Sequence, residues 1–378
     1  MALLLAALSF RAAAAEAQPG CREAFGDSLA VRTIRAFDRA AAVPPVWDDF
    51  TPARHPILLL ADSTHRGRPE TPVCAAIWRA GAPLEVVELA ARPRLLTPLF
   101  GMVNLESVGP ASADPSGGIP AVPDPVAAEL RARGVTRAVV LDVPLDLGRL
   151  GRLGQMLREG RVDPAQMQAD FAVHEGFHLH VQFPHWLDQR RTYAWPAWDQ
   201  QPDRRELRER CYAGSPELAA ALAREIAALV AAFDAVAADS TRRDVTLGVR
   251  HARHAVQLRA ERRRLQDTLT VALGGRRISC ELAEDLLELE EGTTQWIGHA
   301  TMVRAGFATM EGLRGRYAGT QPEVFYQTGP LQLWVLEGIL GGAAMRHVTV
   351  TLARSAGPHA GVFAHFDHHT RLLAERGR

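Results

Sequence analysis

The sequence predicts an α+β fold, in which a small N-terminal β-containing region precedes a largely helical domain. Short apolar runs with β-branched residues are concentrated before about residue 150. Helix-start signals and long helical stretches dominate after that point. A segment rich in Pro, Gly and Ser, at 107–125, reads as a loop or linker within the first part. We therefore expect a mixed α/β region at 18–150 and a helical domain at 151–378.

The first 17 residues resemble a secretory signal peptide. Ala2 to Phe10 are apolar, and Ala15-Glu16-Ala17 forms an A-x-A cleavage pattern ahead of Gln18. No basic residue precedes the apolar run, and Arg11 ends it early. We expect a signal peptide at 1–17 and an exported protein, periplasmic or extracellular. The alternative is an Ala-rich helix at the start of a cytoplasmic protein.

Cysteine count and charge limit the classes of partner. Four cysteines, an even number, suit an exported protein and allow three pairings, which the sequence leaves open: Cys21, Cys74, Cys211 and Cys280. They form no C-x-x-C pair, so we expect no cysteine zinc site, and Cys74 could be a buried thiol. The formal net charge is +0, which gives no support for a nucleic-acid partner. No uncharged run is long enough for a transmembrane segment. The oligomeric state stays open.

Each element has a local signal. The apolar runs predict strands at 55–62, 73–78, 84–89 and 137–143. Asp163-Pro164-Ala165-Gln166 is a capping-box start for a helix that Pro184 ends. Further helices are predicted at 203–236, with a break near Gly214, at 244–271, and at 280–305 after the capping residue Ser279. The Arg-rich stretch 249–264 reads as a solvated helix face with some ion pairs.

The predicted helix at 163–184 carries the pattern H-E-x-x-H. His174 and His178 are four apart, so both imidazoles lie on one helix face and can reach one metal ion. Glu175 is rotated by about 100° from His174. It could therefore act as the general base toward a water on that ion. His180 falls near the apolar stripe, so we interpret it as a packing residue or as a residue that supports a ligand, and not as a ligand itself. A catalytic zinc takes three protein ligands, which requires one more.

The third ligand must come from outside this helix. The residues after His178 lack the Gly and His that a metzincin needs. In the segment 280–300, Glu284, Glu288, Glu291 and Gln295 recur on one helix face. Flanking leucines indicate a well-packed helix, and carboxylates on such a helix need a partner such as a cation.

The two segments together resemble the gluzincin zinc metallopeptidases, which combine H-E-x-x-H with a Glu from a later helix. Glu290-Glu291-Gly292-Thr293-Thr294 is similar to the N-E-G-F-A segment of the one-zinc aminopeptidases, with Glu291 in the ligand position. The resemblance implies a zincin-like domain with Zn2+ between two long helices. It implies His174, His178 and Glu291 as ligands, with Glu288 as the alternative to Glu291.

A further piece of the resemblance lies at EVFYQTGPLQLWVLEGI (323–339). Tyr326, followed by Gly329 and an apolar helix, is similar to segments in gluzincin-like families where a Tyr donates to the developing oxyanion. Tyr317 and Tyr193 compete for that role, and Tyr326 could equally be a core residue. The aromatic segment 185–205 reads as a loop covering the cleft, or as packing against the helices.

We therefore expect a zinc-dependent hydrolase, a metallopeptidase that acts on a peptide or protein substrate. Glu175 and Tyr326 are the predicted catalytic residues, and His174, His178 and Glu291 are the predicted metal ligands. Two alternatives remain: a non-catalytic helical protein that acts through a partner, and a zinc hydrolase of non-peptide substrates.

Overall fold

The computed structural model describes residues 19–26, 28–48, 50–61, 72–93, 100–105, 122–143, 151–160, 162–182, 184, 202–237, 243–319, 323–353 and 361–376. Some predicted features lie outside these residues: the signal peptide at 1–17, most of the loop at 107–125, Tyr193, and all but the last four residues of the aromatic segment 185–205.

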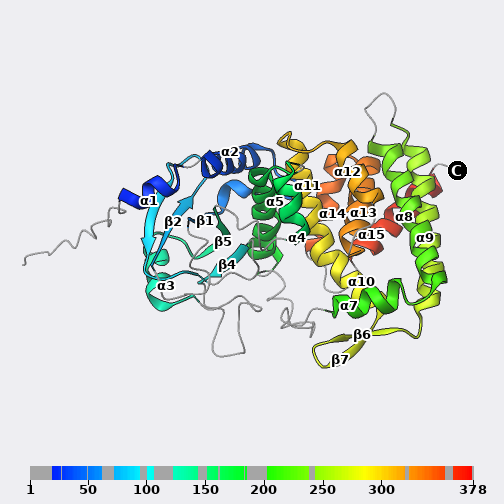
Figure 1. The fold of residues 1–378 in the computed structure, drawn as a ribbon. Helices are drawn as coiled ribbons and strands as arrows, with labels where there is room; N and C mark the ends of the chain where they lie inside the picture. The colour runs from blue at the N-terminus through cyan, green and yellow to red at the C-terminus, as the bar shows by residue number, and fades with distance from the viewer. Residues whose placement is uncertain are drawn as a thin grey trace, which may run out of the picture.

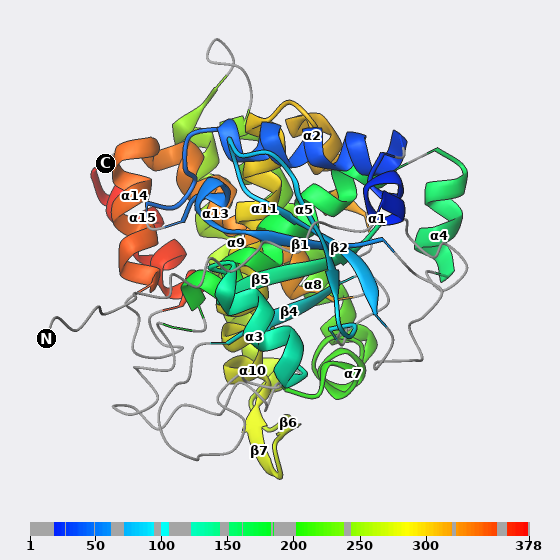
Figure 2. The ribbon, with the colours of Figure 1, turned by 90° about the vertical axis from the view of Figure 1, so that its left-hand side faces the viewer.

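A mixed five-stranded sheet forms the N-terminal part (Figures 1 and 2). Its order is β3-β2-β1-β5-β4, with β1 and β5 parallel and the other neighbours antiparallel. The strands are β1 (Ile57–Leu60), β2 (Val73–Trp78), β3 (Glu85–Leu89), β4 (Phe100–Asn104) and β5 (Arg137–Asp142). Four of them were predicted. Strand β4, with the sequence FGMVN, was missed because it has a glycine and a single β-branched residue.

Both faces of the sheet are covered. Leu58 and Leu60 pack on one face against α3 (Asp124–Ala132), whereas Leu59 and Leu141 belong to the cluster on the other face, with α2 (Ser28–Ala42) and α5 (Pro164–Phe177). This alternation follows the two-residue period of a strand. The loop predicted at 107–125 overlaps α3, which begins at Asp124.

Helices make up most of the remainder. They are α1 (Pro19–Ala24), η1 (Pro52–Arg54), α4 (Gly151–Arg158), α7 (Arg204–Glu206), α8 (Pro216–Ala237), α9 (Val245–Gln266), α10 (Cys280–Leu287), α11 (Thr293–Arg304), α12 (Met310–Ala318), α13 (Phe325–Leu340), α14 (Gly342–Ala353) and α15 (Val362–Arg376). Among the described residues, three π-helical turns interrupt this pattern: η3 (His178–Gln182), η4 (Leu207–Tyr212) and η5 (Glu288–Gly292). The predicted helices at 203–236 and 280–305 are thus composite.

A short hairpin departs from the prediction. The helix expected at 244–271 ends at Gln266, and β6 (Thr270–Leu273) pairs with β7 (Arg276–Ser279). Gly274 and Gly275 form the turn with φ of 48° and 78°. A Gly-Gly pair provides the positive φ that a two-residue hairpin turn requires.

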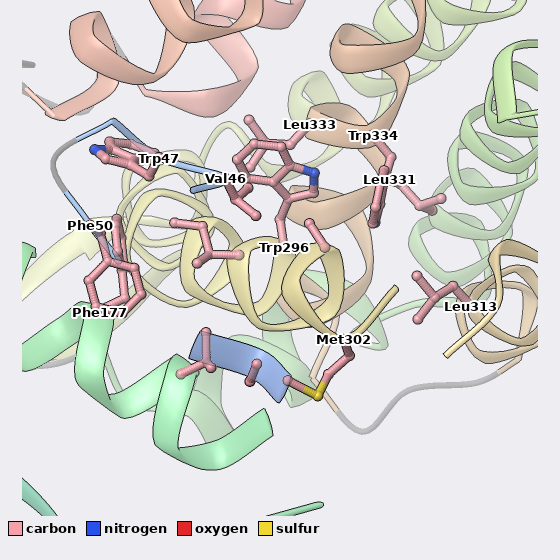
Figure 3. Packing of buried hydrophobic residues seen from close by; sticks show 14 of the residues in the cluster. Val46, Trp47, Phe50, Phe177, Trp296, Met302, Leu313, Leu331, Leu333 and Trp334 are labelled. Atoms are coloured by element: carbon pink, nitrogen blue, oxygen red, sulfur yellow. The ribbon is translucent and has the colours of Figure 1, made fainter. Parts of the chain in front are cut away.

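One apolar core joins the sheet to the helices. Trp47, Phe50 and Phe177 pack together, and the same cluster continues to Trp296 and Trp334 (Figure 3). Helix α5 lies between the sheet and the helices α11 to α13 (Figure 1). The apolar core therefore contains residues from both predicted regions, 18–150 and 151–378. The boundary between two domains near residue 150 stays a prediction.

Two disulfides connect distant segments. Cys21 is bonded to Cys74, and Cys211 to Cys280. The first joins α1 to β2, and the second joins η4 to the start of α10. The alternative of a buried Cys74 thiol was therefore wrong. Among the described helices, none has the length and apolar character needed to cross a membrane.

Candidate metal centre

Helix α5 begins as its sequence predicts. The Asp163 carboxylate accepts hydrogen bonds from the backbone N–H groups of Ala165 and Gln166, at 2.8 and 3.4 Å. Pro164 occupies the first helical position, where no N–H is needed. His174 and Glu175 lie in the last turn of the helix, and His178 begins the π-turn η3. The H-E-x-x-H pattern is therefore helical throughout.

The apolar side of α5 determines where its polar side points. Val173 and Phe177 are buried, and the Phe177 ring lies 4.9 Å from that of Trp47 and 5.4 Å from that of Phe50. His180, on η3, stacks on His55 with ring centroids 3.6 Å apart. It packs against the sheet side, as expected, and is not near the metal donors. His174 and His178 point toward η5 instead, where they meet Glu291.

The two imidazoles converge on one carboxylate oxygen. His174 Nε2 lies 3.4 Å and His178 Nε2 lies 3.6 Å from Glu291 Oε2. Both distances exceed those of ordinary N–H···O hydrogen bonds. Zinc donors in a tetrahedral site are about 3.3–3.4 Å from one another, because each is about 2.0–2.1 Å from the metal. The separations therefore fit co-ligands of one ion.

Glu175 also belongs to this group of donors. Ligand atoms of His174, Glu175 and His178 all lie within 4.8 Å of one another, and Glu175 Oε1 is 3.9 Å from His174 Nε2. All three side chains are buried, as is Glu291. The donor set of two imidazoles and a carboxylate is one that catalytic zinc sites use.

Glu291 has two further partners. Tyr326 donates from its hydroxyl to Glu291 Oε2 at 2.7 Å, and Arg204 donates from Nη2 to Glu291 Oε1 at 2.5 Å. Arg204 Nη1 also lies 3.0 Å from Glu323 Oε2 and 3.4 Å from the Tyr326 hydroxyl. Sequence reasoning missed Arg204, because nothing distinguishes it from the other arginines of RRELRER.

The other carboxylates of the predicted stripe lie elsewhere. Glu288 accepts two hydrogen bonds from Arg259, and Glu284 accepts one from Arg262. Glu288, the alternative ligand, is therefore not at the metal donors, and its negative charge is balanced by arginine. Both arginines are buried, so the expectation of a solvated face at 249–264 was wrong for these two residues.

The π-turn η5 gives Glu291 a different direction from Glu284 and Glu288. Glu284, in α10, and Glu288, the first residue of η5, are four residues apart and lie on one helix face. The π-turn η5 then has more residues per turn than an α-helix. Each residue therefore rotates less about the helix axis than in an α-helix, which turns Glu291 off the face of Glu288 and toward His174 and His178. Single π-turns are frequent at functional sites, and this site has one on each side.

Two glycines bring the Tyr326 helix against η5. A Cβ on Gly329 would lie 2.8 Å from the Gly292 Cα atom, and a Cβ on Gly292 would lie 3.0 Å from the Gly329 Cα atom. Only glycines allow this backbone approach. It places the first turn of α13 beside η5, so that Tyr326 reaches Glu291. Tyr317, a competitor for the role of Tyr326, instead lies beside His299.

The buried side chains of this site differ in their pKa values. Burial raises the pKa of Glu175, against the neighbouring histidines. Burial also acts to raise the pKa of Glu291, but His174, His178 and Arg204 together hold that pKa well below its usual range. Glu291 in turn raises the pKa of His178 to about 9, although burial opposes this. Glu291 is thus held as an anion, whereas Glu175 has a raised affinity for a proton.

The structure brings together His174, Glu175, His178, Glu291 and Tyr326, which the sequence analysis singled out, and adds Arg204. No protein-family model, curated protein or solved structure matches the chain. The geometry of this site is therefore the basis for a proposed function.

Proposed function

We propose that this protein is a zinc-dependent hydrolase of gluzincin type that cleaves peptide bonds. One observation carries the proposal: two imidazole nitrogens lie 3.4 and 3.6 Å from one oxygen of an anionic carboxylate. His174, His178 and Glu291 would hold the zinc. When bound, zinc would act as a Lewis acid that polarises a substrate carbonyl and increases the acidity of water.

Glu175 is the general base in this proposal. Its carboxylate lies beside the donors without being needed as a third ligand, since Glu291 supplies that oxygen. A raised pKa suits a group that must accept a proton from water and then return it to a leaving amine. The raised pKa therefore favours Glu175 over Glu291 as the proton carrier.

In this proposal Tyr326 donates a hydrogen bond to the substrate oxygen on which negative charge develops. Its hydroxyl lies on the Glu291 side of the site, and burial raises its pKa well above the usual value. It therefore stays a neutral phenol that can donate a hydrogen bond where negative charge develops on a substrate oxygen. Arg204 holds Glu291 Oε1, which leaves Oε2 directed at the histidines.

Zinc content and the Glu175→Gln variant test the proposal. Purified protein should contain about one zinc per chain, which is the stoichiometry of a single-ion site. Glu175→Gln should retain the zinc, because Glu175 is not a ligand. It should lose about 10²- to 10⁴-fold in turnover of a peptide library followed by mass spectrometry, the usual contribution of a general base. Glu337→Gln, a change at another glutamate far along the chain, serves as the control and should retain both properties.

Two results would contradict the proposal. A protein that takes up no zinc has no metal centre of this kind. A Glu175→Gln variant that cleaves peptides at the wild-type rate does not use Glu175 as its base. If wild-type protein takes up zinc and cleaves no peptide, the metal site stands and the substrate is of another class, as the alternative of a non-peptide zinc hydrolase requires.

One observation favours the non-catalytic alternative. Arg204 and Tyr326 already provide hydrogen bonds to both oxygens of Glu291, so this carboxylate has partners without a metal. A helical protein in which Arg204 and Tyr326 hold the buried Glu291, without a metal, would show the same contacts. Zinc stoichiometry separates this alternative from the hydrolase, because only the hydrolase requires the ion.

The two disulfides support the proposed export of the protein. Disulfides form and persist in oxidising compartments and are rare in a reducing cytosol. We therefore propose a periplasmic or extracellular location, where a peptide or protein substrate would be encountered.

A further inference from the structure

Gln182 connects the two π-turns that carry metal donors. It is the last residue of η3, and its side chain is 5% exposed. Its Nε2 atom lies 3.2 Å from the Leu289 carbonyl oxygen, 3.1 Å from the Glu290 carbonyl oxygen and 2.9 Å from Thr293 Oγ1. All of these partners belong to η5 or to the residue that follows it. One side chain thus joins the His178 turn to the Glu291 turn.

These partners fix the orientation of the Gln182 amide. A carbonyl oxygen can only accept a hydrogen bond, so the atom that faces the Leu289 and Glu290 carbonyls must be the amide nitrogen. The reversed amide would place its oxygen against two other oxygens, and a buried repulsive contact of this kind is unfavourable. Gln182 Oε1 must therefore point the other way, toward His178.

The amide orientation then determines the tautomer of His178. Gln182 Oε1 lies 2.5 Å from His178 Nδ1. Because Oε1 only accepts, Nδ1 must carry the proton and donate. In the neutral ring, the lone pair is then on Nε2, which is the nitrogen 3.6 Å from Glu291 Oε2. A metal ligand needs an unprotonated nitrogen directed at the ion, and the other ring nitrogen needs a fixed partner.

We infer that Gln182 is a positioning residue of the proposed metal centre. It holds His178 in the tautomer with the proton on Nδ1, and it fixes the position of His178 relative to Glu291 by bonding to the carbonyls of η5. This inference rests on the proposed function, since it assigns a role toward the same ion. In this role Gln182 acts through His178 and η5, which are the groups that its amide contacts.

Gln182→Met tests this role, with Gln168→Met as the matched control. Methionine has the length of glutamine but neither its acceptor nor its donor. Gln168 is also buried, lies in α5, and bonds to Thr33 and to the Asp142 carbonyl, away from the histidines. Both variants lose buried hydrogen bonds, but only Gln182→Met releases His178. Thermal melts of both variants measure the general loss of stability.

Zinc affinity is measured by competition with a chromophoric chelator. Gln182→Met should bind zinc about 10- to 100-fold more weakly than wild type, the usual effect of removing a partner of a ligating histidine. Gln168→Met should stay within about twofold, because it is not coupled to the site. Equal zinc affinities for the two variants would overturn the inference.

A second measurement requires no variant. In zinc-loaded wild-type protein, the His178 Nδ1–H should appear in ¹H–¹⁵N spectra as a signal protected from exchange with solvent, because Gln182 holds it in a buried hydrogen bond. An Nδ1–H that exchanges at once would overturn the inference while zinc binding stands. Wild-type protein that binds no zinc would instead overturn the proposed function, and with it this role; that result is evident before any variant is compared.

Discussion

Three glutamates of one segment have different roles although their side chains are identical. Glu284 and Glu288 neutralise buried arginines, whereas Glu291 lies with His174 and His178. The need of buried carboxylates for cations was a correct expectation from their pattern. For Glu284 and Glu288 the cation is a guanidinium from α9, and Glu291 has Arg204 beside the two histidines. Residue type therefore shows that a partner exists, and only position shows which one.

Substitution of Glu288 and of Glu291 is predicted to affect different properties, the stability of the fold and the binding of zinc. Glu288→Ala removes one partner of a buried ion pair and should lower the free energy of unfolding by about 3 kcal/mol, because Arg259 loses its bidentate partner. Glu291→Ala should abolish stoichiometric zinc binding. Denaturant unfolding and metal analysis of both variants measure this. Zinc retained in Glu291→Ala would exclude Glu291 as a ligand.

At the scale of elements, the site depends on how closely η5 approaches α13. Gly292 and Gly329 face each other, and neither has space for a methyl group against the opposing backbone. Gly176, in the H-E-x-x-H turn, differs. A Cβ there would meet only the Phe50 ring at 3.6 Å and a Val139 methyl at 3.9 Å, which are ordinary contacts.

Alanine at these glycines should therefore have contrasting effects. Gly329→Ala forces the two backbones apart and should destabilise the protein by about 1–3 kcal/mol, the usual cost of overpacking. It should also weaken the contact between Tyr326 and Glu291. Gly176→Ala should be neutral or stabilising by up to about 1 kcal/mol, because Ala favours the helix. Thermal and denaturant unfolding compare the two. A strongly destabilised Gly176→Ala protein would contradict this account.

At the scale of the whole molecule, a polar group is buried between α11 and α12. His299 lies with one ring nitrogen against Gln295 and the other against Tyr317. Burial, with smaller contributions from Arg316 and His174, lowers the pKa of His299 well below 6.5. The folded protein therefore holds this histidine neutral, whereas the unfolded chain protonates it near pH 6.5.

This difference predicts a contribution of His299 to acid sensitivity. A lowered pKa means that the unfolded state binds more protons below pH 6.5, so the contribution is present above that pH and is lost as the pH falls. The slope is at most about 1.4 kcal/mol per pH unit. The stability difference between wild type and His299→Gln should therefore shrink between pH 7 and pH 5. Denaturant unfolding at each pH measures it, and parallel curves would contradict the assignment.

Local chemistry made much of the fold predictable. Four of the five sheet strands, the Asp163 and Ser279 caps, and the break before α8 follow from neighbouring residues alone. The misses also have local causes. Strand β4 contains few residues that favour strands. The helix predicted at 244–271 extends into β6, because the Gly274-Gly275 pair was not recognised as a hairpin turn.

The candidate site divides in a similar way. The spacing of His174, Glu175 and His178 is a property of one helix, so the sequence by itself determined that they share a face. The choice of Glu291 over Glu288 depends on a π-turn, which single-residue propensities do not encode. Arg204 contacts Glu291, and Gln182 contacts the Leu289 carbonyl, and each of these partners is more than eighty residues away in the chain. Only the tertiary structure decided these partners, because long-range packing, and not local sequence, determines which buried charges and amides meet.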